Sequence, residues 1–364
     1  MSEKVLKYSE VLEEVQKSPN NILLLGNGFS IAYNAKRFSF THLKESAIQE
    51  GIIAKDSPIL KLFEKFNTSD FEKIIRLLND YVKIDKILNP KKDNQQLKNE
   101  IEELKKHLVD TITNNHPDTI GTLTPQEYES ACTFLKPYNR IYTLNYDLLL
   151  YWVTMKLLDK KKNEDFPLEI MDGFNEPSTR GELFVSYENK GRTKCGIFYL
   201  HGALHIFDKR DDIIKLTYSR TSIPLKQQIK ENLDQEIYPI FISEGQSSEK
   251  KEKIIHNAYL NHNFRSLQSV GGNLVIFGTL LKMNDEHIQD AICNNQCENI
   301  YIGLFDEDKD PTTLLPFITK LKASPVHKGK KVINRNVFFF DSKSADVWGH
   351  NILSNTDIED KNNA

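Results

Sequence analysis

The stretch NILLLGNGFSIAY, residues 21–33, is a short apolar run that ends in Gly-Asn-Gly and then a serine. Residues 21–25 have the length of a β-strand and no polar–apolar alternation, which is typical of a strand buried on both faces of a parallel sheet. Glycines at 26 and 28 allow a tight turn and a close approach of the backbone to a ligand phosphate. The third glycine of the GxGxxG fingerprint is missing, because Ile31 stands there, and no GK[ST] follows. Alone, the stretch fits a phosphate-binding turn and an ordinary strand-to-helix turn equally well.

Further apolar runs of strand length follow along the chain. Helical patterns separate most of them, for example at 248–269 and 284–294. Strands that alternate with helices predict an α/β fold with a largely parallel sheet. The expected strands are RIYTLNYD (140–147), GIFYLHG (196–202), EIYPIFISEG (236–245), GGNLVIFGT (271–279), ENIYIGLF (298–305) and NRNVFFFDS (334–342).

The pattern changes between the first two strands. Residues 41–136 contain long Glu/Lys-rich segments with a 3.6-residue period, which predict a helical subdomain inserted after the first strand. A partner-binding coiled coil stays open as an alternative. Residues 3–17 predict an amphipathic helix, and the polar stretch 158–193 is interpreted as irregular. The expected organisation is the start of the sheet domain in 1–40, the helical insertion in 41–136, the remainder of the sheet domain in 137–345 and a polar tail in 346–364.

Composition narrows the class of protein. The 364 residues are 39% hydrophobic and 27% charged, as in an ordinary globular protein, and the net charge of -3 gives no general attraction to nucleic acid or anionic membranes. None of the four cysteines forms a CxxC pair. The charged N-terminus is unlike a signal peptide, and no apolar run has membrane-spanning length. We therefore expect a cytoplasmic protein that binds neither membranes nor nucleic acid directly.

Small or polar residues directly follow four of the apolar runs. In open α/β sheets, ligands bind beyond the carboxyl ends of the strands, so these positions are the first to compare. We expect the fold to bring the four clusters together as one site. The clusters are Gly26-Asn27-Gly28-Phe29-Ser30, Thr143-Leu144-Asn145-Tyr146-Asp147, His201-Gly202 and Gly278-Thr279.

The second cluster offers two different functional groups. The neutral amide of Asn145 suits the positioning of a water molecule or a ribose hydroxyl. Asp147 stands where the next helix is expected to begin, so N-capping is its ordinary structural role. A capping aspartate can also orient a polar neighbour, and both roles are kept for Asp147.

The third cluster contains two histidines, His201 and His205, four residues apart in HGALH. On a helix this spacing could bind a metal ion. His201, however, follows a strand and precedes Gly202, and no HExxH is present, so we expect no metal. Its place at a strand end favours a catalytic role for His201, whereas His205 is interpreted as structural.

The motifs GNGFS, TLNYD, HG and FGT, in this order, resemble the sirtuin-like family of NAD-consuming proteins. The family pattern is a Gly-x-Gly-x-Ser turn, a Thr-x-Asn-x-Asp strand end, a His-Gly and a late Gly-Thr or Gly-Ser. The resemblance spans residue 21 to about residue 295 and implies a Rossmann-like sheet. The segments EGQSSEKKEKIIHNAYL and LKMNDEHI look like a bacterial branch of the family that is associated with antiphage defence.

The resemblance implies roles for individual residues. In the implied reaction Asn145 orients a nucleophilic water, His201 anchors the ribose hydroxyls and acts as a general base, and Asp147 supports them. The residues implied in NAD+ binding are Gly26, Asn27, Gly28 and Ser30 at the phosphates, Thr143 at the nicotinamide ribose, and Gly278, Thr279, Asn284 and Asp285 at the adenosine ribose.

One departure from the family bears on function. Its protein deacylases carry a structural zinc held by two CxxC pairs, and this sequence has none. The resemblance to defence-associated members therefore implies an NAD+ hydrolase that releases nicotinamide and ADP-ribose and causes abortive infection by NAD+ depletion. Constant activity would harm the host cell. We therefore expect gating by homo-oligomerisation, by a co-encoded regulatory protein such as a nucleotide-sensing subunit or ATPase, or by a nucleotide signal, with the helical insertion as the candidate surface.

Two other function classes stay open. The first is a module that senses NAD or ADP-ribose without cleaving it, and the second is an NAD-dependent deacylase or ADP-ribosyltransferase. Nicotinamide release distinguishes the hydrolase from the sensor, and dependence of that release on an acyl-peptide would indicate the deacylase. Product analysis separates hydrolysis from cyclisation of ADP-ribose.

Overall fold

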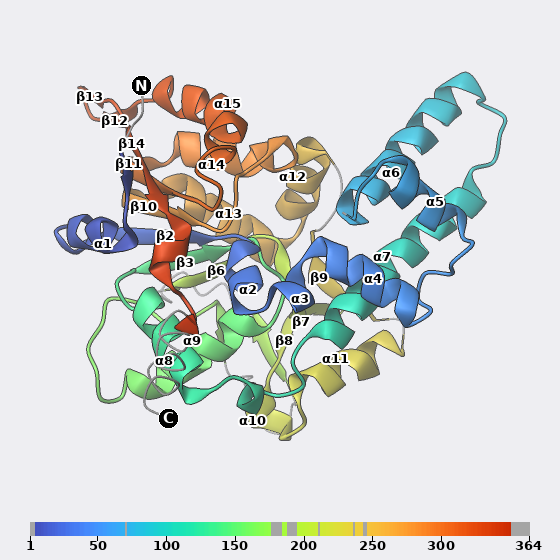
Figure 1. Cartoon of the computed structure of the whole chain (residues 1–364), viewed down its shortest axis with the longest axis horizontal. Helices are drawn as coiled ribbons and strands as arrows, with labels where there is room; N and C mark the ends of the chain where they lie inside the picture. Colours follow the sequence, from blue (N-terminus) through green and yellow to red (C-terminus); the bar gives the residue numbers. More distant parts are fainter. Residues whose placement is uncertain are drawn as a thin grey trace, which may run out of the picture.

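The computed structural model describes residues 4–69, 71–175, 184–187, 195–209, 212–235, 237–242 and 246–350. Its centre is a seven-stranded sheet in which every neighbouring pair is parallel. The strand order is β1-β14-β11-β10-β2-β3-β6 (Figure 1). The fold is thus α/β with a large parallel sheet, as the sequence predicts. The strands are β1 (Val5–Leu6), β2 (Asn21–Leu25), β3 (Arg140–Thr143), β6 (Ile197–Tyr199), β10 (Gly271–Phe277), β11 (Gln296–Leu304) and β14 (Asn336–Asp341).

The strand order reverses direction next to β2. From β2 the chain moves outward to β3 and β6, and it then returns to β10 on the other side of β2 before continuing to β11 and β14. Open α/β sheets bind their ligands beyond the carboxyl ends of the two strands at such a switch point. Here the two central strands are β2 and β10.

A second sheet of five strands is antiparallel, in the order β4-β5-β8-β7-β9. It corrects one expectation, because the run at 236–245 supplies β9 to this sheet and not a strand to the parallel one. Pro239 opens β9 and has no N–H to donate, which suits the edge position that β9 occupies. The strands are β4 (Phe174–Asn175), β5 (Phe184–Tyr187), β7 (Gly202–Lys209), β8 (Asp212–Leu216) and β9 (Pro239–Phe241), and β12 (Val326–Lys328) pairs separately with β13 (Lys331–Ile333).

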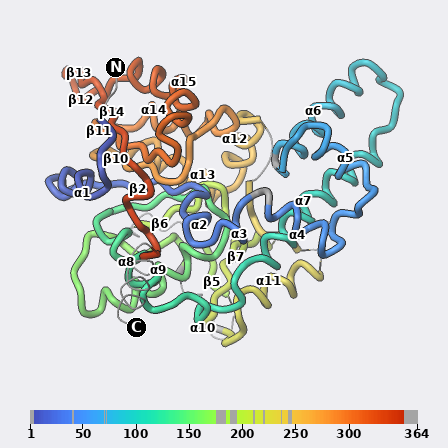
Figure 2. Tube along the Cα trace, viewed as in Figure 1, coloured from blue at the N-terminus to red at the C-terminus, as the bar shows by residue number. Residues whose placement is uncertain are grey.

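Helices cover the sheets and form an arm. Figures 1 and 2 show α5, α6 and part of α7 projecting away from the parallel sheet. In the described part of 41–136 the regular elements are all helical; α6 packs against α7, whereas α8 packs against α9. The helices are α1 (Tyr8–Gln16), α2 (Gly28–Tyr33), α3 (Ala35–Phe38), α4 (Phe40–Gln49), α5 (Pro58–Lys65), α6 (Phe71–Leu88), α7 (Gln95–Asn115), α8 (Pro125–Leu135), α9 (Leu149–Lys160), α10 (Tyr218–Thr221), α11 (Leu225–Leu233), α12 (Ser247–His256), α13 (Ala258–Ser269), α14 (Glu286–Asn294) and α15 (Asp310–Lys322), with short 3₁₀ turns at Ile120–Thr122, Met283–Asp285 and Ser342–Ala345.

A row of asparagines crosses the parallel sheet near the beginning of four neighbouring strands. Asn273 donates to Asn21 at 3.1 Å, Asn299 donates to Asn273 at 3.0 Å, and Asn336 donates to Asn299 at 2.9 Å. Parallel registration aligns these residues directly, so the amides of Asn273 and Asn299 each donate to one neighbour and accept from the other. The row satisfies polar groups that would otherwise be costly in a buried sheet.

The chain end packs on the body beyond the last strand. Trp348 is buried, its indole N–H donates to the Phe29 carbonyl at 2.9 Å, and its ring lies against Phe29 and Tyr33. The expected polar tail therefore begins with packed residues, and 351–364 lie outside the described residues. Within the described part of the chain, the helices are all too short or too polar to span a bilayer.

Candidate active site

Four strands end side by side at one edge of the parallel sheet. Leu25 of β2 is level with Thr143 of β3 and with Phe277 of β10, and Thr143 is level with Tyr199 of β6. The residues that follow these strands therefore leave the sheet at the same height on adjacent positions. The structure thus places the four polar clusters singled out in the sequence next to one another, at and beside the switch point.

The Gly26–Gly28 turn packs directly on the turn after β10. The Gly26 N–H donates to the Phe277 carbonyl and the Gly28 N–H to the Gly278 carbonyl, both at 2.8 Å. A Cβ on Gly28 would lie 2.4 Å from Gly278 Cα, and one on Gly26 would lie 2.3 Å from Thr279 Cβ. Gly278 itself has a φ of +74°, which favours glycine. These glycines therefore serve the close approach of two turns.

The amide groups that open α2 also have partners inside the protein. The N–H groups of Phe29, Ser30 and Ile31 donate to carbonyls of Gly26 and Asn27 at 2.9–3.0 Å. The Asn27 side chain donates to the Phe38 carbonyl at 3.2 Å. The local hydrogen bonds are thus those of a strand-to-helix turn, and a phosphate at this position would have to compete with them.

A buried polar network joins Ser30 to the TLNYD segment. The Ser30 hydroxyl donates to Asp147 Oδ2, and Asn145 Nδ2 donates to Ser30 Oγ at 3.0 Å. The N-cap of α9 is Leu148 and not Asp147 as expected, but Asp147 Oδ1 accepts the Leu149 N–H at 2.9 Å, so Asp147 binds the first residue of the helix and Ser30 at the same time. Burial raises the pKa of the Asp147 carboxyl, while the Ser30 hydroxyl opposes that change. The Ser30 hydroxyl therefore uses its proton in the hydrogen bond to Asp147.

Asn145 is left with one unsatisfied atom. Its backbone N–H donates to Thr143 Oγ1 at 3.0 Å and its Nδ2 is used by Ser30, which fixes the side-chain orientation. Its Oδ1 is buried and finds no hydrogen-bond partner within the described structure. A buried amide oxygen without a donor is unfavourable, and such exceptions concentrate where a ligand or water completes the bonding.

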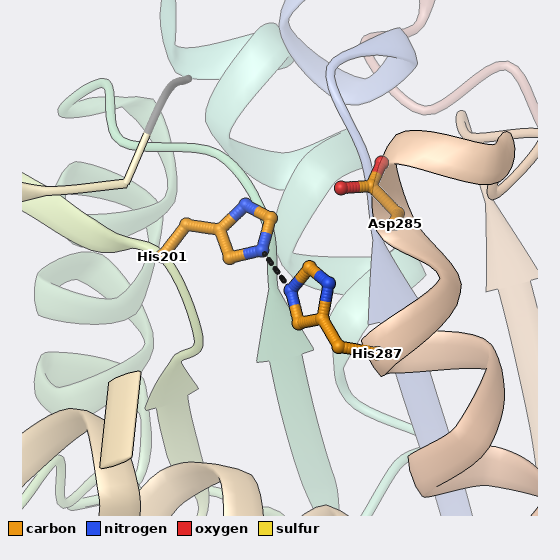
Figure 3. A group of neighbouring side chains, drawn as sticks. All are labelled: His201, Asp285 and His287. Carbon is orange, nitrogen blue, oxygen red and sulfur yellow. Dashed lines mark hydrogen bonds between the residues drawn. The ribbon is translucent and has the colours of Figure 1, made fainter. Parts of the chain in front are cut away.

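His201 faces a second histidine from a distant part of the chain (Figure 3). His201 Nε2 and His287 Nε2 lie 3.2 Å apart, and the two rings are stacked with centroids 5.4 Å apart. Ser247 Oγ of α12 lies 3.1 Å from the ring atom His287 Nδ1, and it also accepts the backbone N–H of His287 at 2.6 Å. Burial lowers the pKa of His201 well below its usual value, with a smaller contribution from Lys250, and lowers that of His287 to about 3. Both imidazoles are therefore neutral near pH 7.

The 3₁₀ turn before α14 brings a carboxylate to the histidines. Asp285 points toward the pair, and one of its oxygens and one nitrogen of each ring all lie within 4.8 Å of one another (Figure 3). Asp285 Oδ1 accepts from the buried Lys250 ammonium at 3.2 Å. Asn284 belongs to the same turn, and Thr279 Oγ1 accepts the Leu281 N–H at 3.1 Å.

The sequence interpretation did not include His287, Ser247 or Lys250. His287 stands only two residues after Asp285 in the segment NDEHI. Its position next to an expected binding residue is the feature of the sequence that could have indicated it. Ser247 and Lys250 lie in the segment EGQSSEKKEKIIHNAYL, which carries part of the resemblance, but its sequence does not assign them to the site, because α12 reaches the site only through the fold. His205 lies in a different environment, buried against Tyr151 and Tyr199.

Comparison with known proteins places the chain in a family. No curated protein matches the sequence. A family model described as "Domain of unknown function (DUF4917)" matches residues 23–348. The matched region runs from β2 to the buried Trp348, and it includes all four strand-end clusters and His287. Because this match covers most of the sequence, the chain belongs to the DUF4917 family.

Proposed function

We propose that the chain is an NAD+ hydrolase that releases nicotinamide and ADP-ribose. The observation that carries the proposal is the buried, unsatisfied Oδ1 of Asn145 at the end of β3. The adjacent strand β6 ends at the same height and is followed by His201. An acceptor held in a fixed orientation beside a neutral imidazole suits a reaction in which water is oriented and deprotonated.

The topology supports a nucleotide substrate. Numbered from β2, the order β6-β3-β2-β10-β11-β14 is the 3-2-1-4-5-6 order of doubly wound dinucleotide-binding sheets. The Gly26–Gly28 and Gly278–Thr279 turns follow β2 and β10 at the switch point of that order, and Asn145 and His201 follow β3 and β6 on one side of it. This arrangement supports the Rossmann-like interpretation, and the motif order supports the sirtuin-like one.

The chemistry requires little acid catalysis at the leaving group. Nicotinamide in NAD+ is a cationic ring, so the bond from ribose C1′ to the ring nitrogen breaks with its electron pair going to that nitrogen. Water adds to C1′ of the oxocarbenium-like ribose, and its proton passes to His201 and then to solvent. Asn145 Oδ1 accepts a hydrogen bond from the attacking water. Asp147 and Ser30 are positioning residues, because they hold the Asn145 amide.

The arm supports the proposed gating. The C-terminal half of α6 exposes four apolar side chains, which suits contact with a partner: Tyr81, Ile84, Ile87 and Leu88. The same helix contacts the start of α12, where Lys83 pairs with Glu249 and Asp80 accepts from Gln246 at 3.4 Å. Because Ser247 of α12 holds His287, a partner bound to α6 has a short physical route to the site. We propose a second copy of the chain or a co-encoded protein as that partner, and antiphage defence as the setting.

The alternative of a non-hydrolytic NAD sensor is favoured by one observation. Burial lowers the pKa of His201 well below its usual value, and an imidazole with so low a pKa is a weak base toward water. A sensor would bind NAD+ and would release no nicotinamide in any assembly state. The two functions are therefore separated by product formation and not by binding.

The test is chromatographic measurement of nicotinamide and ADP-ribose after NAD+ is incubated with the full chain, alone and with co-encoded proteins. Asn145→Ala and His201→Ala are each expected to lower the rate by about 100-fold or more, the range lost with a general base or its water. His256→Ala, an exposed histidine at the end of α12, is the matched control and should keep the wild-type rate. Wild-type turnover in Asn145→Ala, with an unchanged unfolding transition, would exclude the assigned mechanism.

A further inference from the structure

We propose that His201, His287 and Asp285 form a binding site for one divalent ion of the zinc class. The three side chains come from two distant segments, the end of β6 and the start of α14, and converge on one point (Figure 3). The ligand class is a metal ion with a preference for imidazole nitrogen. The site does not depend on the proposed function, because it follows from the positions of ligand atoms alone.

The spacing of the two nitrogens fits a common metal. For zinc–nitrogen bonds of roughly 2.0–2.1 Å in a tetrahedron, two ligand nitrogens lie about 3.3 Å apart. His201 Nε2 and His287 Nε2 are 3.2 Å apart, so one ion can bind both without moving either ring far. A carboxylate oxygen of Asp285 lies within 4.8 Å of the nitrogens and needs a shift of about 1–1.5 Å to complete three ligands.

The outer contacts match those of metal ligands. A ligating histidine usually hydrogen-bonds through its other ring nitrogen, and His287 Nδ1 has Ser247 Oγ at 3.1 Å. Asp285 Oδ1 is held by Lys250, which leaves the second carboxylate oxygen for the ion. The His201 carbonyl accepts the Ile242 N–H at 2.8 Å, which fixes the backbone of that ligand. The side chains of His287 and Asp285 therefore have contacts that orient them, and His201 is held through its backbone.

The donor set selects the kind of ion. Two imidazoles and one carboxylate suit Zn2+ and the neighbouring transition metals, whereas Mg2+ and Ca2+ prefer sites made of oxygen. Three protein ligands leave a fourth position for water or a competing molecule, unlike a closed structural zinc site. An ion there would occupy the imidazole that the proposed reaction uses as its base and would inhibit hydrolysis. Only this inhibition rests on the proposed function.

The test begins with the full chain freed of metal by a chelator and titrated with ZnCl2 in a calorimeter. One ion per chain is expected. His287→Gln should lower the affinity by about 100-fold or more, Ser247→Ala by about tenfold as for other outer contacts, and His256→Ala should bind as the wild type does. Titration with CoCl2 supplies a second measurement on the wild type, because visible absorption reports a low-symmetry site with nitrogen ligands.

The outcomes are distinct. Wild-type Zn2+ affinity in His287→Gln, or no uptake by the wild type, overturns the site. If His287→Gln loses its unfolding transition, Asp285→Asn and the cobalt spectrum decide, and a spectrum of hydrated Co2+ alone overturns the proposal. Zinc that binds once per chain to a protein that never releases nicotinamide would uphold the site and reject the proposed hydrolase. Zinc that binds without slowing an active enzyme would uphold the site and reject only the inhibition.

Discussion

Replacement of Gly28 by alanine tests whether the GNG turn is a packing element. The new Cβ would lie 2.4 Å from Gly278 Cα and 3.0 Å from the Gly278 carbonyl oxygen, and both are backbone atoms that cannot rotate away. The two turns must separate by about 1 Å to reach ordinary contact, which weakens the 2.8 Å bond from the Gly28 N–H to Gly278. Overpacking costs about 1–3 kcal/mol and a lost hydrogen bond about 1 kcal/mol, so a loss of about 3 kcal/mol is expected.

The assay is thermal unfolding of the full chain. A protein of 364 residues has an unfolding entropy of roughly 0.8 kcal/mol/K, so this loss lowers the Tm by about 4 °C. Gly121→Ala is the matched control, because its nearest contact would be a side-chain oxygen at 3.7 Å, and its Tm should stay within about 1 °C. A Gly28→Ala protein that unfolds with the control would refute the packing role and would return the turn to a ligand-binding interpretation.

Three further predictions concern buried polar groups. Arg335→Lys should lower the free energy of unfolding in urea by about 3 kcal/mol. The guanidinium donates to five oxygens that one ammonium cannot all reach, and these belong to Asn295, Cys293, Cys297 and Ser324. An unchanged urea midpoint would contradict this prediction. Asn273→Ala should lower the free energy of unfolding by about 2–3 kcal/mol, because it breaks the asparagine row between Asn21 and Asn299. Asn336→Ala, at the exposed end of the row, should lower it by less than about 1 kcal/mol. Equal losses would show that the row is not a buried network. Burial lowers the pKa of His116 and His287 to about 3 in the folded protein. In the unfolded chain these histidines have an ordinary pKa of about 6.5, so between pH 6.5 and pH 3 the unfolded chain binds more protons than the folded protein. The free energy of unfolding therefore falls as the pH drops from 6.5 toward 3. From pH 7 to pH 5 each of these two histidines should cost roughly 2 kcal/mol, so His116→Gln should lose about 2 kcal/mol less than the wild type in urea titrations at the two pH values, and an equal loss would contradict this.

Most of the parallel sheet was predictable because its inner strands are buried on both faces, whereas the edge strand β1 lies in the segment 3–17 that was expected to be helical. Such strands appear as unbroken apolar runs, and six of the seven expected runs contain strands of that sheet. The remaining run, at 236–245, has the same apolar character, but it contains the three-residue strand β9 at an edge of the antiparallel sheet. A local pattern reports burial and does not report the partner strand. The stretch 158–193 was expected to be irregular, but it contains the short strands β4 and β5. They are held by pairing of β4 with β5 and of β5 with β8, which lies later in the chain.

The site was predictable only as far as strand ends could be located. Asn145 and His201 follow strands, and parallel registration then determines that they leave the sheet at one height. His287 lies 86 residues from His201 and reaches it from a helix, so no spacing in the sequence relates the two. Lys250 and Ser247 come from α12, whose sequence is that of an exposed, charged helix. The electrostatic surroundings of His201 are therefore a product of tertiary packing.

The GNG turn shows why a glycine motif does not identify its ligand. Glycine at a strand end means that something approaches the backbone too closely for a Cβ, and a phosphate and another backbone satisfy that condition equally well. Here the other backbone is the Gly278 turn, which itself requires glycine at a φ of +74°. The same contact joins the ends of β2 and β10 at the point where the strand order reverses. A nucleotide bound beyond these strand ends would therefore meet two turns that already contact each other. Its recognition would fall to neighbouring side chains, with the unsatisfied Oδ1 of Asn145 first among them.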